Sequence, residues 1–152
     1  MEKARLMNVA SVAEVQGSYG AIRVPESLIQ KIWYTGDYDR TGLVLLDGRP
    51  LRVKNPGRWN LGDGPDFREA TLEVSGRKIQ GDVEIHFYEN DWASHGHGKD
   101  PAYDNVVLHV LLFPPRHNEC GARTVSGKLL PACALLPCLN RDIEEYAAED
   151  AL

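Results

Sequence analysis

Residues 66–88 read DFREATLEVSGRKIQGDVEIHFY, and this stretch predicts a β-hairpin at the heart of the fold. One strand covers 66–74, the dipeptide Ser75-Gly76 supplies a tight turn, and the return strand covers 79–88. Side chains alternate between the two faces of a strand. On the return strand, one face carries Gln80, Asp82, Glu84 and His86, and the other carries Ile79, Val83, Ile85 and Phe87.

Further elements are expected on both sides of this hairpin. Pro25 and Glu26 suit the first turn of a helix, and Leu28, Ile29, Ile32 and Trp33 follow at helical spacing up to about Gly36. The other expected elements are strands at 43–46, 51–53, 106–113 and 127–136, and a helix that Asn140 caps and that ends near 148. The order of elements predicts an α/β (α+β) fold, with a central mixed β-sheet flanked by helices.

The connection from Glu89 to Asn105 decides whether the following strand is parallel to the hairpin. A parallel crossover needs at least about a dozen residues and normally contains a helix. This connection is long enough, but Gly96, Gly98 and Pro101 disfavour a helix. A more antiparallel sheet is therefore the alternative.

The length of 152 residues fits one domain. We expect an N-terminal extension over 1–22, partly helical and with little function, and a single α/β domain over 23–152. The longest nearly apolar run, 106–113, is far shorter than the roughly 20 residues of a membrane-spanning helix. The N-terminus does not resemble a secretory signal, so we expect a cytoplasmic protein without a membrane span.

Net charge and cysteine content restrict the possible partners. The formal net charge of −5 provides no long-range attraction to phosphate backbones, which disfavours nucleic acid as a partner without excluding a local basic groove. The three cysteines, Cys120, Cys133 and Cys138, are an odd number, so reduced thiols are expected. A zinc site made of the three cysteines is an alternative role for them.

The most unusual feature of the chain is a cluster of histidines and carboxylates. Four of the five histidines lie within 24 positions, at His86, His95, His97 and His109. Mixed nitrogen and oxygen ligands suit Zn, Mn or Fe, whereas carboxylates alone suit Mg or Ca. The predicted ligands of a divalent ion (Mg, Mn or Zn) are Asp66, Glu84, His86, His95 and His97. Alternatively, His95 and His97 lie in a solvated loop and His109 is a buried core histidine.

The hairpin carries a motif of its own. Pro65-Asp66 followed by Glu84-x-His86 resembles the Pro-Asp…(Asp/Glu)-x-Lys signature of a superfamily of phosphodiesterase nucleases. This resemblance implies a restriction-endonuclease-like core, in which Asp66 and Glu84 bind Mg and a helix such as that of Glu26 often adds a carboxylate. His86 stands where that superfamily has lysine, which is a departure from the signature. For Glu26 the simpler alternative is a favourable charge in a first helical turn.

A second resemblance covers 26 to about 136. Six pieces in order, GPDF (64–67), GDVEIH (81–86), DW (91–92), HGH (95–97), AYDNV (102–106) and LHV (108–110), are similar to the pattern of domain of unknown function 2851. This family is bacterial and functionally undescribed. The resemblance implies that members are longer than this chain, which would then be the N-terminal part of such a protein.

Three functional hypotheses use these residues. The first is a metal-dependent hydrolase of phosphodiesterase or nuclease type acting on nucleic acid, with Asp66, Glu84 and His86 as catalytic residues. The second is a non-catalytic domain in which the same residues form a structural metal site or a hydrogen-bonded network under an interaction surface. The third is a hydrolase of a different substrate.

Overall fold

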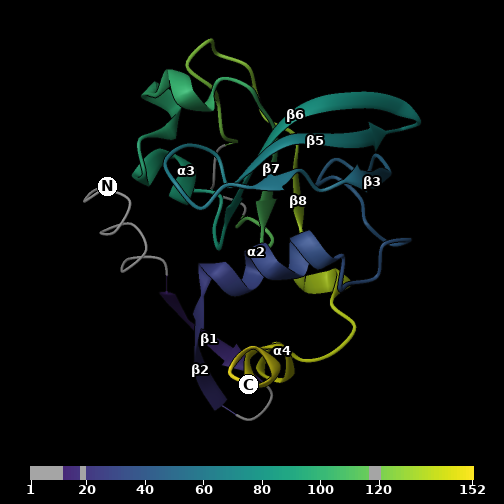
Figure 1. Ribbon diagram of the computed structural model, residues 1–152, viewed down its shortest axis with the longest axis vertical. Coiled ribbons are helices and arrows are strands. Elements are labelled where there is room, and N and C mark those ends of the chain that lie inside the picture. The colour runs from purple at the N-terminus through teal and green to yellow at the C-terminus, as the bar shows by residue number, and fades with distance from the viewer. Residues whose placement is uncertain (1–11, 18–19, 117–120) are drawn as a thin grey trace.

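The computed structural model describes residues 12–17, 20–116 and 121–152. A mixed sheet forms one layer, and α2 (Glu26–Thr35) crosses beneath it (Figure 1). The hairpin of β1 (Val12–Gly17) and β2 (Gly20–Pro25), together with α4 (Ile143–Asp150), lies on the far side of α2. Helix α2 therefore has packing partners on two sides, which explains why Leu28, Ile29, Ile32 and Trp33 are all buried.

The central sheet has the order β3-β5-β6-β7-β8, with the short β4 paired to β5. Its strands are β3 (Leu51–Asn55), β4 (Arg58–Trp59), β5 (Phe67–Val74), β6 (Arg77–His86), β7 (Val106–Leu111) and β8 (Ala132–Ala134). Neighbours are antiparallel from β3 through β6, whereas β6, β7 and β8 are parallel to one another. The expectation of a mixed sheet with helices is therefore confirmed, and the more antiparallel alternative is wrong.

The parallel crossover from β6 to β7 is built without a long helix. It consists of three short turns, α3 (Asp91–Ser94), η1 (His97–Lys99) and η2 (Pro101–Tyr103). Gly96, with a φ of 74°, turns the chain between the first two. The glycines that disfavour a helix here are thus compatible with a parallel connection, because single turns bring the chain back to the sheet.

Both faces of β6 are buried where the strand approaches the crossover. Val83 and Ile85 join the main core with the apolar side of α2, and the paired residues of β7, Leu108 and Val110, lie in the same core. Glu84 and His86 project to the opposite side and are nevertheless buried. A second apolar cluster covers that side and contains Trp92, Tyr103, Val106, Ala122 and Leu130. Polar groups are thus enclosed between the sheet and the crossover.

Several expected elements differ from the structure. The described part of the N-terminal extension forms strands rather than a helix, because β-branched residues in 12–25 favour the β1–β2 pairing. Residues 1–11 lie outside the described part of the chain. The expected strand at 43–46 is reduced to a bridge between Val44 and Pro50, since a tight turn at Gly48 follows immediately. The strand expected at 127–136 is only β8, and α4 begins after Asp142 rather than Asn140.

Gly81 provides a test of the β6–β7 contact. A Cβ at this position would meet the side chain of Val107 and lie 2.8 Å from the carbonyl oxygen of Asn105. Gly81→Ala should therefore lower the free energy of unfolding by about 1–3 kcal/mol, as overpacked sites do. Gly62→Ala, whose Cβ would only touch Asn60 at 3.7 Å, is the matched control. Chemical denaturation of both variants checks this, and equal midpoints would contradict the close approach.

Candidate metal centre

The buried carboxylate of Glu84 lies at the centre of the site. Its Oε1 accepts a hydrogen bond from the backbone N–H of Asp66 at 3.0 Å. Its Oε2 lies 2.8 Å from Nε2 of His97 and 3.4 Å from Nε2 of His86. Glu84 therefore connects the segment entering β5 with histidines of β6 and of the crossover.

Asp66 lies beside Glu84, just before β5, and is half-buried. Its Oδ2 accepts a hydrogen bond from the N–H of Ile85 at 2.8 Å, and its Oδ1 accepts one from Nε2 of Gln30 at 3.1 Å. The Asp66 N–H donates to Glu84 in return, so each strand donates a backbone N–H to a carboxylate of the other. These bonds hold the two carboxyl groups close together at the β5–β6 pair.

Proximity and burial raise the pKa values of three carboxyl groups. Burial, followed by the charge of Glu84, raises the pKa of Asp66 well above its usual range. Burial raises the pKa of Glu84 to about 8, with the charge of Glu26 adding to the effect and hydrogen bonds from Asp66 opposing it. Burial and the charges of Asp66 and Asp91 raise the pKa of Glu26 to about 9. The three carboxyl groups therefore keep their protons to a higher pH than exposed carboxyl groups do, and a bound cation would favour their ionised forms.

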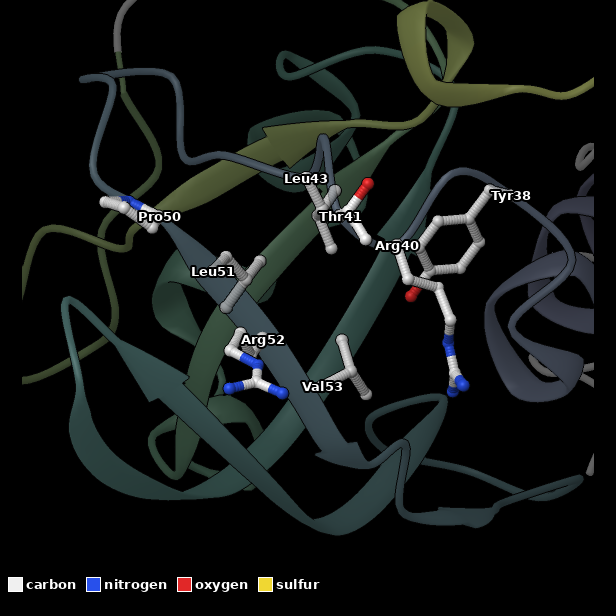
Figure 2. Close-up of a pocket in the computed structure, with 8 residues that line it drawn as sticks. All are labelled: Tyr38, Arg40, Thr41, Leu43, Pro50, Leu51, Arg52 and Val53. Atoms are coloured by element: carbon white, nitrogen blue, oxygen red, sulfur yellow. The ribbon is translucent and has the colours of Figure 1, made fainter.

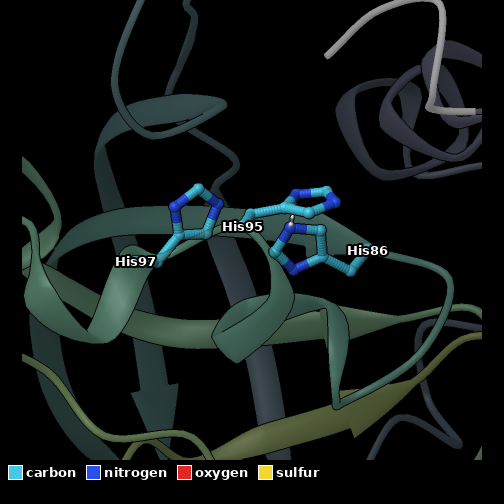
Figure 3. A group of neighbouring side chains, drawn as sticks. All are labelled: His86, His95 and His97. Atoms are coloured by element: carbon cyan, nitrogen blue, oxygen red, sulfur yellow. Dashed lines mark hydrogen bonds between the residues drawn. The ribbon is translucent and has the colours of Figure 1, made fainter.

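Three histidines converge on the same place. His86 ends β6, while His95 and His97 flank Gly96 in the crossover (Figure 3). Nε2 of His86 lies 3.2 Å from Nδ1 of His95, and one nitrogen from each ring lies within 4.8 Å of the other two. Tetrahedral Zn ligands at their usual bond lengths stand about 3.3 Å apart. Modest movement of the rings would therefore place the three nitrogens and Glu84 Oε2 around one ion.

His86 and His95 are held in the form that metals bind. Burial, and then the neighbouring histidines, lower the pKa of His86 well below its usual range. Burial and His97 also lower the pKa of His95, which is half-buried. A metal ion requires an imidazole with a free lone pair, and a low pKa keeps that lone pair free at neutral pH.

Aromatic side chains form the wall of the site on the crossover side. The ring of His97 stacks on Tyr103 with the centroids 3.8 Å apart, and Trp92 meets the same imidazole edge-on at 5.3 Å. The indole Nε1 of Trp92 donates to the carbonyl of Arg123 at 2.8 Å, which fixes the plane of the ring. The His97 ring therefore has little freedom, and His95 remains the more accessible of the crossover histidines.

The structure brings the five predicted ligands together, in two groups that share Glu84. Glu84, His86, His95 and His97 converge on one point, while Asp66 joins through Glu84 and its oxygens accept other hydrogen bonds. His97 is buried, so the solvated-loop alternative is wrong for that residue. Gln30, Trp92 and Tyr103 are not among the predicted ligands, although Trp92 and Tyr103 lie in the DW and AYDNV pieces of the family pattern. An aromatic residue in such a piece is as compatible with the core as with the wall of a site, and the glutamine has no local signal.

Two other features lie away from this centre. A cavity of about 420 Å³ is lined by Tyr38, Arg40, Thr41, Leu43, Pro50, Leu51, Arg52 and Val53, none of which belongs to the site (Figure 2). Of the three cysteines, Cys133 is buried and Cys138 is half-buried, both with free thiols. Cys120 lies outside the described residues, so the three-cysteine zinc alternative stays a prediction.

Comparison with known proteins identifies the family. The profile of a family described as "Protein of unknown function (DUF2851)" matches residues 26–149. The chain belongs to this family. The matched range contains every residue of the candidate metal centre. No curated protein and no solved structure matches the chain. Among the described residues of this DUF2851 protein, no helix is long and apolar enough to cross a membrane.

The raised pKa of Glu26 predicts a pH dependence of stability without metal. The folded-state pKa of about 9 exceeds the ordinary value of 4.5, so the folded protein keeps the proton after the unfolded chain has lost it. The contribution of Glu26 to the free energy of unfolding is fully present below about pH 4.5 and is lost as the pH rises toward 9. In chelator, the stability advantage of Glu26→Gln over wild type should therefore grow between pH 5 and pH 9.

Thermal melts in a pH series measure this difference, and the comparison cancels the contribution of the histidines. Glu145→Gln, which alters an exposed carboxyl of α4, is the control and should stay parallel to wild type. A constant difference between Glu26→Gln and wild type would show that burial and the nearby carboxylates do not raise the pKa of Glu26.

Proposed function

We propose that this protein is a metal-dependent hydrolase that cleaves phosphodiesters, with nucleic acid as the substrate class. The observation that carries the proposal is the convergence of Glu84 Oε2 with the nitrogens of His86 and His97, at 2.8–3.4 Å, beside carboxyl groups of raised pKa. Such carboxyl groups resist ionisation in the absence of a cation, and a cation would stabilise their carboxylate forms. Such an arrangement costs stability in the absence of the ion, as functional sites commonly do.

The donor set favours some metals over others. Three imidazole nitrogens and one carboxylate oxygen suit Zn or Mn, whereas Mg prefers oxygen ligands. We therefore propose Zn or Mn as the ion, with Glu84, His86, His95 and His97 as its ligands. Asp66 is proposed as a carboxylate beside the ion rather than as one of these four, because Gln30 and Ile85 already donate to its oxygens.

The proposed residues would divide the chemistry as follows. The ion would polarise a phosphoryl oxygen and lower the pKa of a bound water. Asp66 and Glu26, which are less buried than Glu84, would accept the proton of the attacking water. His86 would act as a ligand rather than as a general base, since its Nε2 faces Glu84 and His95 while its Nδ1 contacts another histidine.

The order of elements supports phosphodiesters as substrates. Helix α2 is followed by the antiparallel strands β3, β5 and β6, a crossover, and the parallel strand β7. Carboxylates lie in the first turn of the helix, before β5 and on β6, at Glu26, Asp66 and Glu84. The resemblance to the Pro-Asp…(Asp/Glu)-x-Lys nucleases implies carboxylates at these same three places. In this protein His86 stands in place of the lysine and the crossover adds two more histidines. These nitrogen ligands would favour Zn or Mn over the Mg of those nucleases.

A non-catalytic metal site is a second candidate, favoured by the burial of the centre. Glu84, His86 and His97 are each at most 3% exposed, which is typical of structural metal sites that substrate does not reach. In that case the ion would fasten the crossover to the sheet and support a surface for a partner. Both candidates predict the same ion. They differ in catalysis, because only the hydrolase should cleave a substrate and lose that activity when Asp66 is replaced.

Metal binding is the first test. Wild-type protein should bind one Zn or Mn ion, and Glu84→Gln and His86→Ala should weaken binding at least about 100-fold, because each removes a ligand. Glu69→Gln, which alters an exposed carboxylate paired with Arg58, is the control and should bind as wild type does. Isothermal titration calorimetry of the untagged, chelator-treated protein measures these affinities. Failure of Zn, Mn and Mg to bind at millimolar concentration would overturn the proposal.

Catalysis is tested separately with single-stranded, duplex and branched DNA and with RNA, in Zn and in Mn. Asp66→Asn should retain the ion and lose about 100-fold or more in cleavage rate, because the proposed proton acceptor is removed. Glu69→Gln should cleave at the wild-type rate, and activity that survives in Glu84→Gln would indicate a contaminating nuclease. An ion that raises the melting temperature while no substrate is cleaved would favour the structural site.

A further inference from the structure

His109 makes a contact that the proposed ligand set does not explain. It lies on β7 opposite Glu84 in the parallel register and is fully buried. Its Nε2 lies 2.8 Å from Nδ1 of His86, while Nε2 of His86 faces Glu84 and His95. His109 is therefore behind His86, on the side away from the converging ligand atoms.

We propose that His109 is a positioning residue of the metal centre, which accepts a hydrogen bond from Nδ1–H of His86 and thereby directs the Nε2 lone pair of His86 toward the ion. The inference rests on the proposed metal site. A neutral imidazole carries one proton, so a His86 ring that uses Nε2 as a ligand must hold its proton on Nδ1. The contact at 2.8 Å provides an acceptor for that proton.

The same contact has a second, opposite arrangement. When His109 donates from Nε2, His86 accepts at Nδ1 and carries its proton on Nε2, where Glu84 Oε2 at 3.4 Å and His95 Nδ1 at 3.2 Å are the nearest acceptors. This arrangement suits the metal-free centre, because the proton then lies between His86 and a carboxylate. Binding of the ion shifts the proton of His86 from Nε2 to Nδ1 and that of His109 from Nε2 to Nδ1.

The other nitrogen of His109 makes this exchange costly. Among the described residues, Nδ1 of His109 has no hydrogen-bond partner and is buried. In the metal-free arrangement it is a lone pair, and in the metal-bound arrangement it is an N–H donor without an acceptor. An unpaired buried polar group lowers stability, so this cost offsets part of the affinity that His109 contributes as an acceptor. The ring of Trp92 packs beside the imidazole of His109, with 5.4 Å between the two ring centroids.

Two substitutions of His109 separate its hydrogen bond from its volume. His109→Leu removes the acceptor and should weaken Zn binding by roughly 10- to 100-fold, the range found for partners of metal-bound histidines. His109→Gln keeps an acceptor oxygen and should recover most of the affinity. Competition titrations with a chromophoric Zn chelator measure both, and melting curves in excess chelator establish that each variant is folded.

Nitrogen-15 NMR of the histidine rings in the wild type reports the proton positions directly and does not depend on either variant folding. The Zn-bound protein should show His86 protonated on Nδ1, and the metal-free protein should show it protonated on Nε2. The inference is overturned if Zn-bound His86 is protonated on Nε2, or if folded His109→Leu binds Zn as tightly as wild type. A wild type that binds no ion would overturn the metal site itself, whereas equal affinities of wild type and His109→Leu would overturn only the role of His109.

Discussion

The contact between Glu84 and the histidines of the crossover is the constraint on which the rest of the structure depends. A carboxylate that is only 3% exposed needs partners for both oxygens, and here they come from three segments: the entry to β5, the end of β6, and the crossover. Those segments must meet at one point. The parallel return to β7, the short turns and the aromatic wall of Trp92 and Tyr103 all serve to enclose that point.

The parts of the fold that could be predicted from the sequence are those with a local signal. The β5–β6 hairpin follows from alternation around Ser75-Gly76, and α2 follows from apolar residues at helical spacing that end before Gly36, whose φ is 68°. Strand β7 follows from its continuous apolar run. The grouping of these polar side chains was largely predictable too, because Glu84 and His86 share one face of a strand and His95 and His97 flank a glycine.

The remaining features depend on long-range packing and had no local signal. The contact of His109 with His86 arises from the register that places His109 beside Glu84 in the parallel β6–β7 pair, and no tight turn fixes the register of two strands that a crossover separates. Gln30 reaches Asp66 from a different element, 36 positions away. The β1–β2 hairpin was mispredicted because mixed composition allows either helix or strand until a neighbour provides the pairing. The strand expected at 43–46 is reduced to a bridge because the turn at Gly48 follows it immediately.

The location of the histidines also determines where the chain can vary in length. Two of them lie inside the crossover, so an added or deleted residue between His86 and His97 would displace an imidazole relative to Glu84. The opposite end of the hairpin has no such restriction. Ser75 and Gly76 are exposed there, at the end of the sheet away from α3 (Figure 1). An exposed turn of this kind tolerates the insertion of a peptide tag or a small domain, which would leave the spacing of Glu84 and the histidines unchanged.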